Sequence, residues 1–339
     1  MLQSHSNFQR LRKVVVGRSY PPEFYSWIPS TSVRKIMEKI AEQTEADFQK
    51  LIELLESLDV EVYRPDLSTV ESMDPSTGKF YKPPMYPRDD MLLLDGKFFV
   101  FHARTNDPYD HIIDMVRSQG NPIFDCRDPG LEYLRTLSAP CIVKGGPSVL
   151  LDQFSDDLSL TKEQINQAID QFTHDFLGRY TTHKIDTGGH SDGTFCIVAP
   201  GLIISTQGAP SLGPDFADWE IVEIPGRTWE ADSIAKQYKQ LQEQNGRRFN
   251  FWIPGQDYDP EVVDFIDNGL SHWLGNVEES VFDVNMLVID EHTVICNQPN
   301  PLMDATFQQW GITAHYCDLK TSVFWDGGLN CVTLDLHRS

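Results

Sequence analysis

The sequence predicts an α/β fold made of repeated units, each with a β-hairpin, a helix and a third strand. Apolar runs of strand length alternate with longer amphipathic stretches along the chain. Short turns rich in Gly, Pro or Asp separate pairs of these runs, as they do in hairpins. The pattern recurs about every fifty residues with little literal identity, which indicates an architecture assembled from similar units.

The N-terminal part is expected to form a strand, a long helix and a second strand. The strand at Leu11–Gly17 ends at a glycine, Val33–Leu58 carries apolar residues at helical spacing, and Val60–Tyr63 is extended. Asp95-Gly96 then marks a hairpin, because this dipeptide favours a two-residue turn. The hairpin strands are expected at Met91–Leu94 and Phe98–Phe101.

The rest of the chain continues the pattern. The segment Thr161–Leu177 is expected to be a helix, and Thr161 and Gln164 have the spacing of a capping box. Two further helices are expected near His111–Ser118 and Pro301–Trp310. The remaining expected strands lie near Ile123 and at Cys141–Val143, Val149–Leu151, His183–Asp186, Phe195–Ala199, Leu202–Ser205, Glu220–Ile224, Met286–Ile289, Val294–Cys296, Thr313–Tyr316 and Cys331–Leu336.

We expect residues 1–339 to form one domain, although about two would be usual for this length. No low-complexity linker divides the chain. The Gly- and Pro-containing segments Gly208–Pro214 and Asn245–Asp259 are better explained as surface loops than as domain boundaries.

Composition excludes several classes of protein. Hydrophobic residues make up 40% of the chain, which does not fit a disordered protein. The 28 basic residues against 50 acidic ones give a net charge of −22, and this field repels a nucleic acid backbone. No apolar run approaches the ~20 residues of a membrane span, and no secretory leader is evident. We therefore expect a cytoplasmic protein with neither a nucleic acid nor a membrane as its partner.

The six cysteines are scattered without a Cys-x-x-Cys pair, so neither a disulfide framework nor a zinc site is expected. The Gly-Gly pairs lack the spacing of a phosphate-binding loop. No metal, nucleotide or flavin cofactor is therefore expected.

Three short segments place reactive or ionisable residues beside apolar strands, where rigid scaffolds often present functional groups. They are Tyr86-Pro87-Arg88-Asp89-Asp90, Gly188-Gly189-His190-Ser191-Asp192-Gly193-Thr194 and Gly327-Gly328-Leu329-Asn330-Cys331.

Cys331 and His190 are candidates for covalent and acid–base chemistry. A thiol with a histidine partner can become a nucleophilic thiolate, and an imidazole with a pKa near ~6.5 exchanges protons at neutral pH. The alternatives are a small buried hydrophobic residue for Cys331 and a hydrogen-bonded loop residue for His190.

Asp89 and Asp192 are candidates for holding a cation. In an extended strand Asp192 would share a face with His190, two residues away, and could orient the imidazole, bind a cation or solvate a turn. Asp89 could accept two hydrogen bonds from a guanidinium group. The alternative for that segment is a surface ion pair between Arg88 and Asp90.

These segments, in this order and at these separations, resemble the amidinotransferases and arginine deiminases of the pentein superfamily, and glycine amidinotransferase and its bacterial relatives most of all. The resemblance extends from Val14-Val15-Val16-Gly17-Arg18 through Asn285-Met286-Leu287-Val288-Ile289-Asp290 to Cys331 and the residues after it, nearly the whole chain. It implies a pentein-type α/β propeller of five ββαβ units around a central active site.

The resemblance also implies roles for individual residues. Cys331 would attack the guanidinium carbon of a small-molecule guanidino donor, His190 would protonate the departing amine, and Asp89 and Asp192 would clamp the guanidinium nitrogens. The same motif places Arg88 among the expected substrate-binding residues. A covalent amidino-cysteine would then pass its amidino group to an amine acceptor or to water.

The chain departs from the family where a Glu-Gly-Gly-Asp or Asp-Ala-Ala-Asp turn usually supplies a carboxylate, because the best-matching stretch is Lys144-Gly145-Gly146-Pro147. An ammonium beside a substrate cation would cost about 4 kcal/mol at about 4 Å with an effective dielectric near ~20. Either Lys144 points away and a carboxylate such as Asp125, Asp128 or Asp152 substitutes, or the usual substrate is not bound.

A second departure follows the histidine motif. Glycine amidinotransferases carry there an arginine that grips the donor's carboxylate, and counting from His190 puts Ala209 at that place. Either a nearby cation such as Lys144 takes this role, and Lys144 is therefore counted among the expected substrate-binding residues, or arginine is a less secure donor.

The sequence therefore leaves three hypotheses about the function of the protein. The leading hypothesis is a metal-free transfer of an amidino group from arginine or a relative to an amine. The second is hydrolysis of a guanidino compound through the same intermediate. The third is a non-catalytic pentein that binds a small molecule or a protein, as the ribosome anti-association factor of similar fold does. The oligomeric state stays open, with a homodimer among the alternatives.

Overall fold

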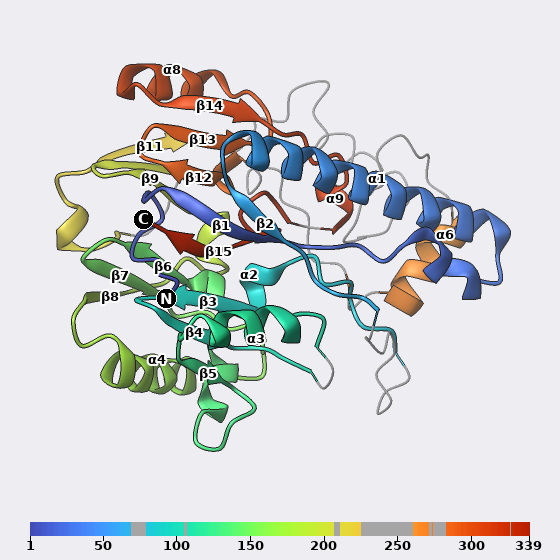
Figure 1. Ribbon diagram of the computed structural model, residues 1–339, viewed down its shortest axis with the longest axis horizontal. Coiled ribbons are helices and arrows are strands. Elements are labelled where there is room, and N and C mark those ends of the chain that lie inside the picture. Colours follow the sequence, from blue (N-terminus) through green and yellow to red (C-terminus); the bar gives the residue numbers. More distant parts are fainter. Residues whose placement is uncertain are drawn as a thin grey trace.

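A computed structural model describes residues 1–68, 79–104, 107–206, 211–224, 260–270, 273, 283–325 and 327–339. Its strands form five three-stranded sheets (Figure 1). In every sheet the middle strand pairs antiparallel with one neighbour and parallel with the other. The predicted α/β architecture of five repeated units is therefore confirmed.

The strand bounds agree with most of the expected segments. The five sheets are β15 (Thr333–Arg338), β1 (Leu11–Val16) and β2 (Glu61–Tyr63); β3 (Met91–Leu94), β4 (Lys97–Val100) and β5 (Ile123–Asp125); β6 (Ile142–Gly145), β7 (Ser148–Asp152) and β8 (Thr181–Ile185); β9 (Phe195–Ala199), β10 (Leu202–Thr206) and β11 (Glu220–Ile224); and β12 (Leu287–Asp290), β13 (Thr293–Cys296) and β14 (Thr313–Tyr316).

The helical elements lie mainly between the second and third strands of the units or just before the first strand. They are η1 (Pro22–Trp27), α1 (Thr31–Ser57), α2 (Pro87–Asp90), α3 (Asp110–Ser118), η2 (Glu132–Thr136), η3 (Ala139–Cys141), α4 (Lys162–Phe176), η4 (Ser191–Gly193), η5 (Pro214–Phe216), α6 (Pro260–Phe265), the π-helical η6 (Ile266–Leu270), α8 (Pro301–Trp310) and α9 (Ser322–Trp325).

Local sequence explains the clearest boundaries. Asp95 and Gly96 both have positive φ, 53° and 72°, as a tight hairpin turn between β3 and β4 requires. The predicted capping box is present at the start of α4, where Thr161 and Gln164 exchange side-chain and backbone hydrogen bonds. Helix α8 begins after the cap Asn300 and ends at Gly311 in the left-handed conformation.

The first unit is assembled from both ends of the chain. Strand β15 pairs antiparallel with β1, from Leu11 opposite Arg338 to Val16 opposite Thr333, while β2 pairs with β1 on the other side. Figure 1 shows β15 and β1 side by side and the two termini near them. The final apolar run, which no helix follows, therefore completes the unit that the N-terminal strand begins.

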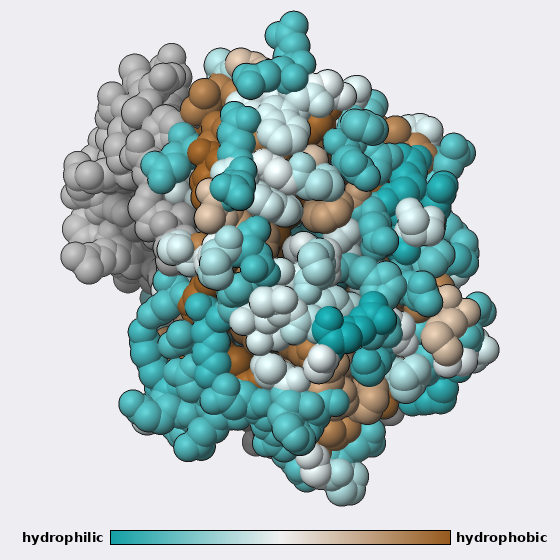
Figure 2. Space-filling model, turned by 90° about the vertical axis from the view of Figure 1, so that its left-hand side faces the viewer, coloured by the Kyte–Doolittle hydropathy of each residue, from teal (hydrophilic) through white to brown (hydrophobic). Residues whose placement is uncertain are grey.

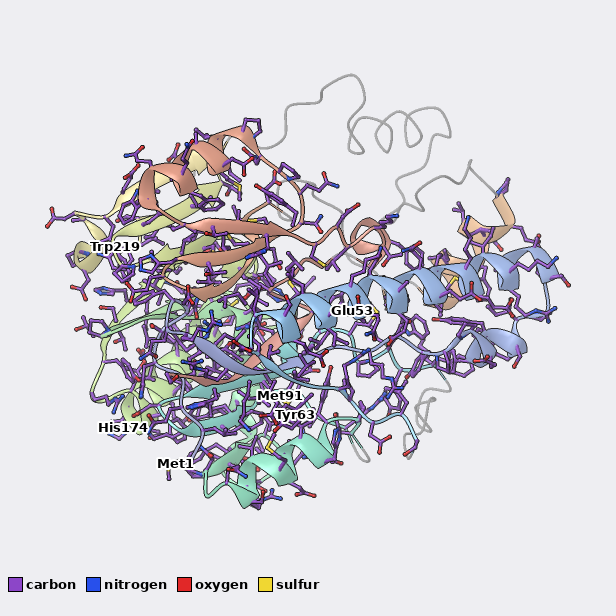
Figure 3. All side chains as sticks on the ribbon, turned by 45° about the horizontal axis from the view of Figure 1, so that its top comes forward. Met1, Glu53, Tyr63, Met91, His174 and Trp219 are labelled. Atoms are coloured by element: carbon purple, nitrogen blue, oxygen red, sulfur yellow. The ribbon has the colours of Figure 1, made fainter. Side chains whose placement is uncertain are left out.

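Apolar side chains fill the seams between the units. One cluster joins the first and second units, with Val15 of β1, Met91 of β3 and Leu334 of β15 buried together and Tyr63 packed against them. Figure 3 shows Tyr63 and Met91 close to each other in this cluster. Other clusters join the second unit to the third, the third to the fourth and the fourth to the fifth. Burial of this apolar surface is the main force that holds the units together.

A buried ion network ties β15 to the second and third units. Asp335 on β15 accepts hydrogen bonds from Arg88 Nη2, at 2.8 Å, and from Lys144 Nζ. Arg338 and Ser4 also donate to it, at 3.2 and 2.6 Å. Burial alone would raise the pKa of Asp335, but Lys144, Arg88 and Arg338 hold it well below its usual range. Burial lowers the pKa of Lys144 to about 8 against the opposing effect of Asp335.

The structure decides between the alternatives that the sequence left open for two segments. Residues Ser191–Gly193 form a 3-10 turn rather than a continuous strand, so His190 and Asp192 do not alternate along β9. Arg88 pairs with Asp335 and not with Asp90. Among the described residues between β10 and β11, the helical element is the short η5. Ala209 and the predicted loop Asn245–Asp259 lie outside the described residues.

The described surface is mainly polar (Figure 2). Figure 2 shows mainly hydrophilic residues on the face it presents, with smaller hydrophobic areas between them. No described helix is both long and apolar enough to cross a membrane.

We predict that Asp335→Asn destabilises the protein by about 3–5 kcal/mol, because three buried cations lose their shared carboxylate. Urea unfolding would measure the loss. Lys162→Gln, which breaks the exposed ion pair with Asp186, is the matched control and should leave the unfolding midpoint unchanged. Equal midpoints for the two variants would contradict a stabilising role for the network.

Candidate functional site

The candidate residues precede the first strands of different units. Asp89 lies in the single helical turn α2 before β3, His190 caps the turn η4 before β9, and Cys331 lies just before β15. Contacts between α2, η3, η4 and β15 bring these segments together. Residues that are far apart in sequence therefore meet where several hairpins begin.

Cys331 is held by an asparagine and an aspartate. The Nδ2 of Asn285 donates to Cys331 Sγ at 3.0 Å, and Asn285 Oδ1 accepts from the backbone N–H groups of Asn330 and Cys331, at 2.8 and 3.2 Å. Cys331 Sγ donates to Asp192 Oδ2 at 3.4 Å, and Asn330 Nδ2 donates to the same oxygen at 2.9 Å. The thiol is therefore fixed beside a carboxylate.

The two glycines before Cys331 permit this close packing. A Cβ added at Gly328 would lie 2.6 Å from Asn285 Oδ1, and one added at Gly327 would lie 2.4 Å from the ring of Tyr86. If alanine replaced either glycine, the neighbouring side chain, Asn285 or Tyr86, would have to move. Gly328 is therefore needed so that Asn285 can reach the backbone of Cys331, and Gly327 leaves room for the ring of Tyr86.

His190 is paired with a carboxylate that the sequence did not single out. Its Nε2 lies 2.9 Å from Asp156 Oδ1 and 3.2 Å from Ser138 Oγ, and Ser138 donates to Asp156 Oδ2 at 2.7 Å. The other ring nitrogen, Nδ1, has no hydrogen-bond partner among the described residues. The imidazole is thus anchored through one nitrogen, while the other can serve a ligand.

The carboxylates determine the protonation of His190. Burial lowers the pKa of His190, but the hydrogen bond to Asp156 and the charges of Asp89, Asp156 and Asp192 outweigh it and raise the pKa to about 10. The pKa of Asp156 falls to about 2 because its bonds to His190 and Ser138 exceed the opposing effect of burial. At neutral pH the pair is therefore an imidazolium and a carboxylate.

Asp89 and Asp192 each present a buried oxygen, Oδ1, with no hydrogen-bond partner in the described part of the chain. Burial and the charges of Asp192 and Asp156 raise the pKa of Asp89 to about 7, although His190 opposes them. Unpaired buried carboxylate oxygens are costly and favour a ligand that donates hydrogen bonds. A planar cation with several N–H donors meets that requirement.

The thiol of Cys331 is protonated in this arrangement. Burial, followed by the charges of Asp192 and Asp89, raises the pKa of Cys331 well above its ordinary value. A cation bound between the two aspartates would have the opposite effect, because an adjacent positive charge favours a thiolate.

Arg88 and Lys144 are not brought to this group. Arg88 donates to Asn330 O and to Asp335, at 2.9 and 2.8 Å, and the buried Lys144 ammonium binds Asp335 and Ser4. Both cations thus belong to the ion network on β15. The Lys144 ammonium therefore points away from Cys331. This orientation is the first of the two alternatives that the sequence left open for Lys144.

The carboxylate that pairs with His190 is not one of the three that the sequence suggested. Asp125 binds Arg127, and Asp152 accepts from Thr187 and Ser191 in the loop that carries His190. Asp156 follows β7 in an Asp-rich loop and lacks a motif of its own, so no pattern distinguished it. In the described part of the chain, no cluster of three or more His, Cys, Asp or Glu residues could hold a metal ion.

A cavity of about 320 Å³ adjoins the site at Asp89. It is lined by Tyr81, Lys82, Pro83, Pro84, Tyr86, Asp89, Asp90, His102, Ala103, Arg104, Asp107, Pro108 and Tyr109. Its volume lies within the range of small-molecule sites.

No family model and no curated protein matches the chain. Solved structures do match over nearly its whole length. An amidinotransferase of the saxitoxin biosynthetic pathway from Microseira wollei is 16% identical with a TM-score of 0.65, and the match covers 99% of this chain and 97% of that one. The chain has the pentein fold.

Further solved structures share this pentein fold. Inosamine-phosphate amidinotransferase from Streptomyces griseus is 14% identical with a TM-score of 0.66, over 100% of this chain and 97% of its own. A variant of dimethylarginine dimethylaminohydrolase from Pseudomonas aeruginosa, complexed with citrulline, is also 14% identical, with a TM-score of 0.52 over 96% and 99%. The propeller that the sequence resemblance implied is thereby confirmed.

We predict that Asp156→Asn lowers the pKa of His190 from about 10, since burial is then opposed only by the charges of Asp89 and Asp192. Titration of the His190 ring signals by NMR would measure it. Ser138→Asp combined with Asp156→Ser should restore much of the shift, because Ser138 also contacts His190 Nε2. Asp170→Asn, which breaks an exposed pair with Lys184, is the control. An unchanged His190 pKa in Asp156→Asn would disprove the pairing.

Proposed function

We propose that the protein transfers an amidino group from a guanidino donor to an amine acceptor through a covalent intermediate on Cys331. The observation that carries the proposal is the fixed thiol of Cys331 beside two aspartates with unpaired buried oxygens and beside an imidazolium. A thiol, a proton donor and a cation clamp are the groups that this chemistry requires.

The guanidinium group of the donor binds between Asp89 and Asp192. Its N–H groups donate to the unpaired Oδ1 atoms, and its positive charge replaces the thiol proton as the partner of the carboxylates. The thiol of Cys331 then loses its proton to solvent, because the bound cation stabilises the thiolate. Binding of the donor and activation of the nucleophile are therefore one event.

The first half-reaction forms the covalent intermediate. The Cys331 thiolate attacks the guanidinium carbon and forms the S–C bond, giving a tetrahedral intermediate. His190, which is protonated at neutral pH, gives its proton to the leaving nitrogen as the C–N bond breaks. The products are a free amine and an amidino group on Cys331.

The second half-reaction reverses these steps with a different amine. Neutral His190 removes a proton from the acceptor amine, the amine nitrogen attacks the amidino carbon, and the S–C bond breaks to restore the thiolate. Asp156 holds the imidazole in the same orientation for both proton transfers. Water in place of the amine would give hydrolysis.

Transfer is favoured over hydrolysis by the comparisons of fold. The two amidinotransferases align with TM-scores of 0.65 and 0.66, whereas the dimethylaminohydrolase aligns with 0.52. Products formed in the absence and in the presence of an amine separate the two reactions. Release of urea or ammonia without an acceptor would support the hydrolase.

We predict a mass increase on Cys331 when the protein is briefly exposed to a guanidino donor, and a labelled guanidino product when an amine is added. Intact-protein mass spectrometry and product chromatography would detect them. Cys331→Ala should lower turnover by at least about a thousandfold, because the nucleophile is lost. Cys126→Ala, which removes a buried thiol outside the site, is the control. Full activity of Cys331→Ala would disprove the mechanism, and absence of any adduct or product would favour a non-catalytic binding protein.

We also predict that affinity for guanidino compounds rises with pH between about 6 and 8. The cation binds ionised Asp89, whose pKa is about 7, so affinity increases up to about tenfold per pH unit below that value and levels off above it. Calorimetry with Cys331→Ser would measure binding without turnover. Asp89→Asn should bind more weakly and lose this pH dependence. An unchanged profile in that variant would exclude Asp89 from the clamp.

A further inference from the structure

The cavity beside Asp89 contains a second histidine, His102, which the proposed reaction does not use. His102 lies just after β4, and its backbone N–H donates to Asp90 O at 3.4 Å, which ties it to the turn α2 that carries Asp89. Its Nε2 atom is buried and has no hydrogen-bond partner in the described part of the chain. A buried ring nitrogen without a partner favours a ligand that completes its hydrogen bond.

The surroundings of His102 favour its uncharged form. Burial lowers the pKa of His102 below its ordinary value, and the charges of Arg135 and His190 act in the same direction. The charge of Asp156 and a hydrogen bond with the backbone of Leu137 oppose them without reversing the shift. Because Nε2 is unpaired, the bond with Leu137 uses Nδ1, and a neutral imidazole that donates through Nδ1 has an acceptor at Nε2. His102 is therefore a proton acceptor at neutral pH, whereas His190 is a proton donor.

Asp89 links His102 to the position of the covalent step. Both residues line the cavity of about 320 Å³, and each has a buried polar atom, Asp89 Oδ1 and His102 Nε2, without a partner among the described residues. The charges of Asp156 and His190 also act on His102, so the two histidines lie near the same carboxylates.

The other charged groups that line the cavity are less suited to accept a proton. Lys82 and Arg104 are cations. Asp107 already accepts from the backbone N–H groups of Arg104 and Tyr109, at 3.1 and 3.0 Å. Burial raises the pKa of Asp90 well above its ordinary value, which favours the protonated acid. The unpaired nitrogen of His102 is therefore the acceptor that the cavity offers beside Asp89.

The second half-reaction has to remove two protons from an aliphatic amine. Such an amine has a pKa near ~10 and enters as an ammonium ion at neutral pH. It loses one proton before its nitrogen has a lone pair for attack, and another once the new C–N bond has formed. His190 returns to its protonated state by taking one proton, so it cannot take both.

We propose that His102 is a second base, which takes the first proton from the ammonium group of the acceptor through Nε2, while His190 takes the second. The proposal rests on the proposed function for the amidino group on Cys331. The N–H bond of the ammonium breaks, and its electron pair forms the C–N bond as the S–C bond breaks. His102 then releases its proton to solvent. The amine that left in the first half-reaction takes up one proton from solvent, so the full cycle is balanced.

Methylamine and hydroxylamine test this assignment, because they are similar in size but only methylamine is a cation at neutral pH. With L-arginine as the donor, His102→Asn should lower kcat/KM for methylamine by about 100- to 1000-fold near pH ~7, since only about one methylamine in a thousand is then neutral. The loss should shrink by up to about tenfold for each pH unit above ~7. Hydroxylamine should change by less than about threefold. Product chromatography would measure both reactions.

Formation of the Cys331 adduct without an amine is the internal control, and its rate should be the same in His102→Asn. His174→Gln, which alters an exposed histidine beside Asp175, is the matched control. His102→Gln serves if His102→Asn does not fold. Equal losses for the two amines, no loss for either, slower adduct formation, or a wild-type protein that uses hydroxylamine but not methylamine would overturn the role of His102. Absence of both adduct and product in the wild-type protein would instead overturn the proposed function.

Discussion

The antiparallel pairing of β15 with β1 is the constraint on which the arrangement of the candidate site depends. Cys331 lies at the entry to β15, so the position of its thiol is set by a strand that the N-terminal part of the chain must receive. Asp335 on the same strand binds Arg88 and Lys144, which come from the second and third units. Cys331 is therefore placed by contacts that span the whole sequence.

The electrostatics of the site follow from an excess of buried carboxylates. The hydrogen bond to Asp156 raises the pKa of His190 against the effect of burial, while burial together with the charges of Asp192 and Asp89 raises the pKa of Cys331. A preformed thiolate would be exposed to oxidants and alkylating agents, since reactivity follows the thiolate fraction. In the proposed mechanism the thiolate forms only when the cationic donor binds, which avoids that exposure.

Many local elements could be predicted from the sequence because their signals are short-range. Asp95-Gly96 forms the expected turn, the capping box at Thr161 opens α4, and α8 has the bounds that its apolar spacing suggested. The strand face that His190 and Asp192 would share in an extended segment is not formed, because Ser191–Gly193 forms a turn that lets Asp192 reach Cys331. Hydrophobic periodicity does not contain that information.

The partner of His190 illustrates the same limit. Asp125, Asp128 and Asp152 were plausible from their nearness in sequence, but a hydrogen bond depends on where loops meet in space. Asp156 reaches His190 because the loop after β7 folds back toward the start of β6, where Ser138 also lies. A loop carboxylate among several others gives no sequence signal that separates it from a solvated one.

The sequence by itself determined the alternation of strands and helices, the repeated unit and the identities of the residues able to do chemistry, since these follow from side-chain properties and short-range spacing. Only the tertiary structure decided which of those residues meet. It assigned Lys144 and Arg88 to a buried ion network, Asp156 to His190, and Asn285 to the thiol, because contacts between separate units arise when apolar seams close and buried charges must find partners.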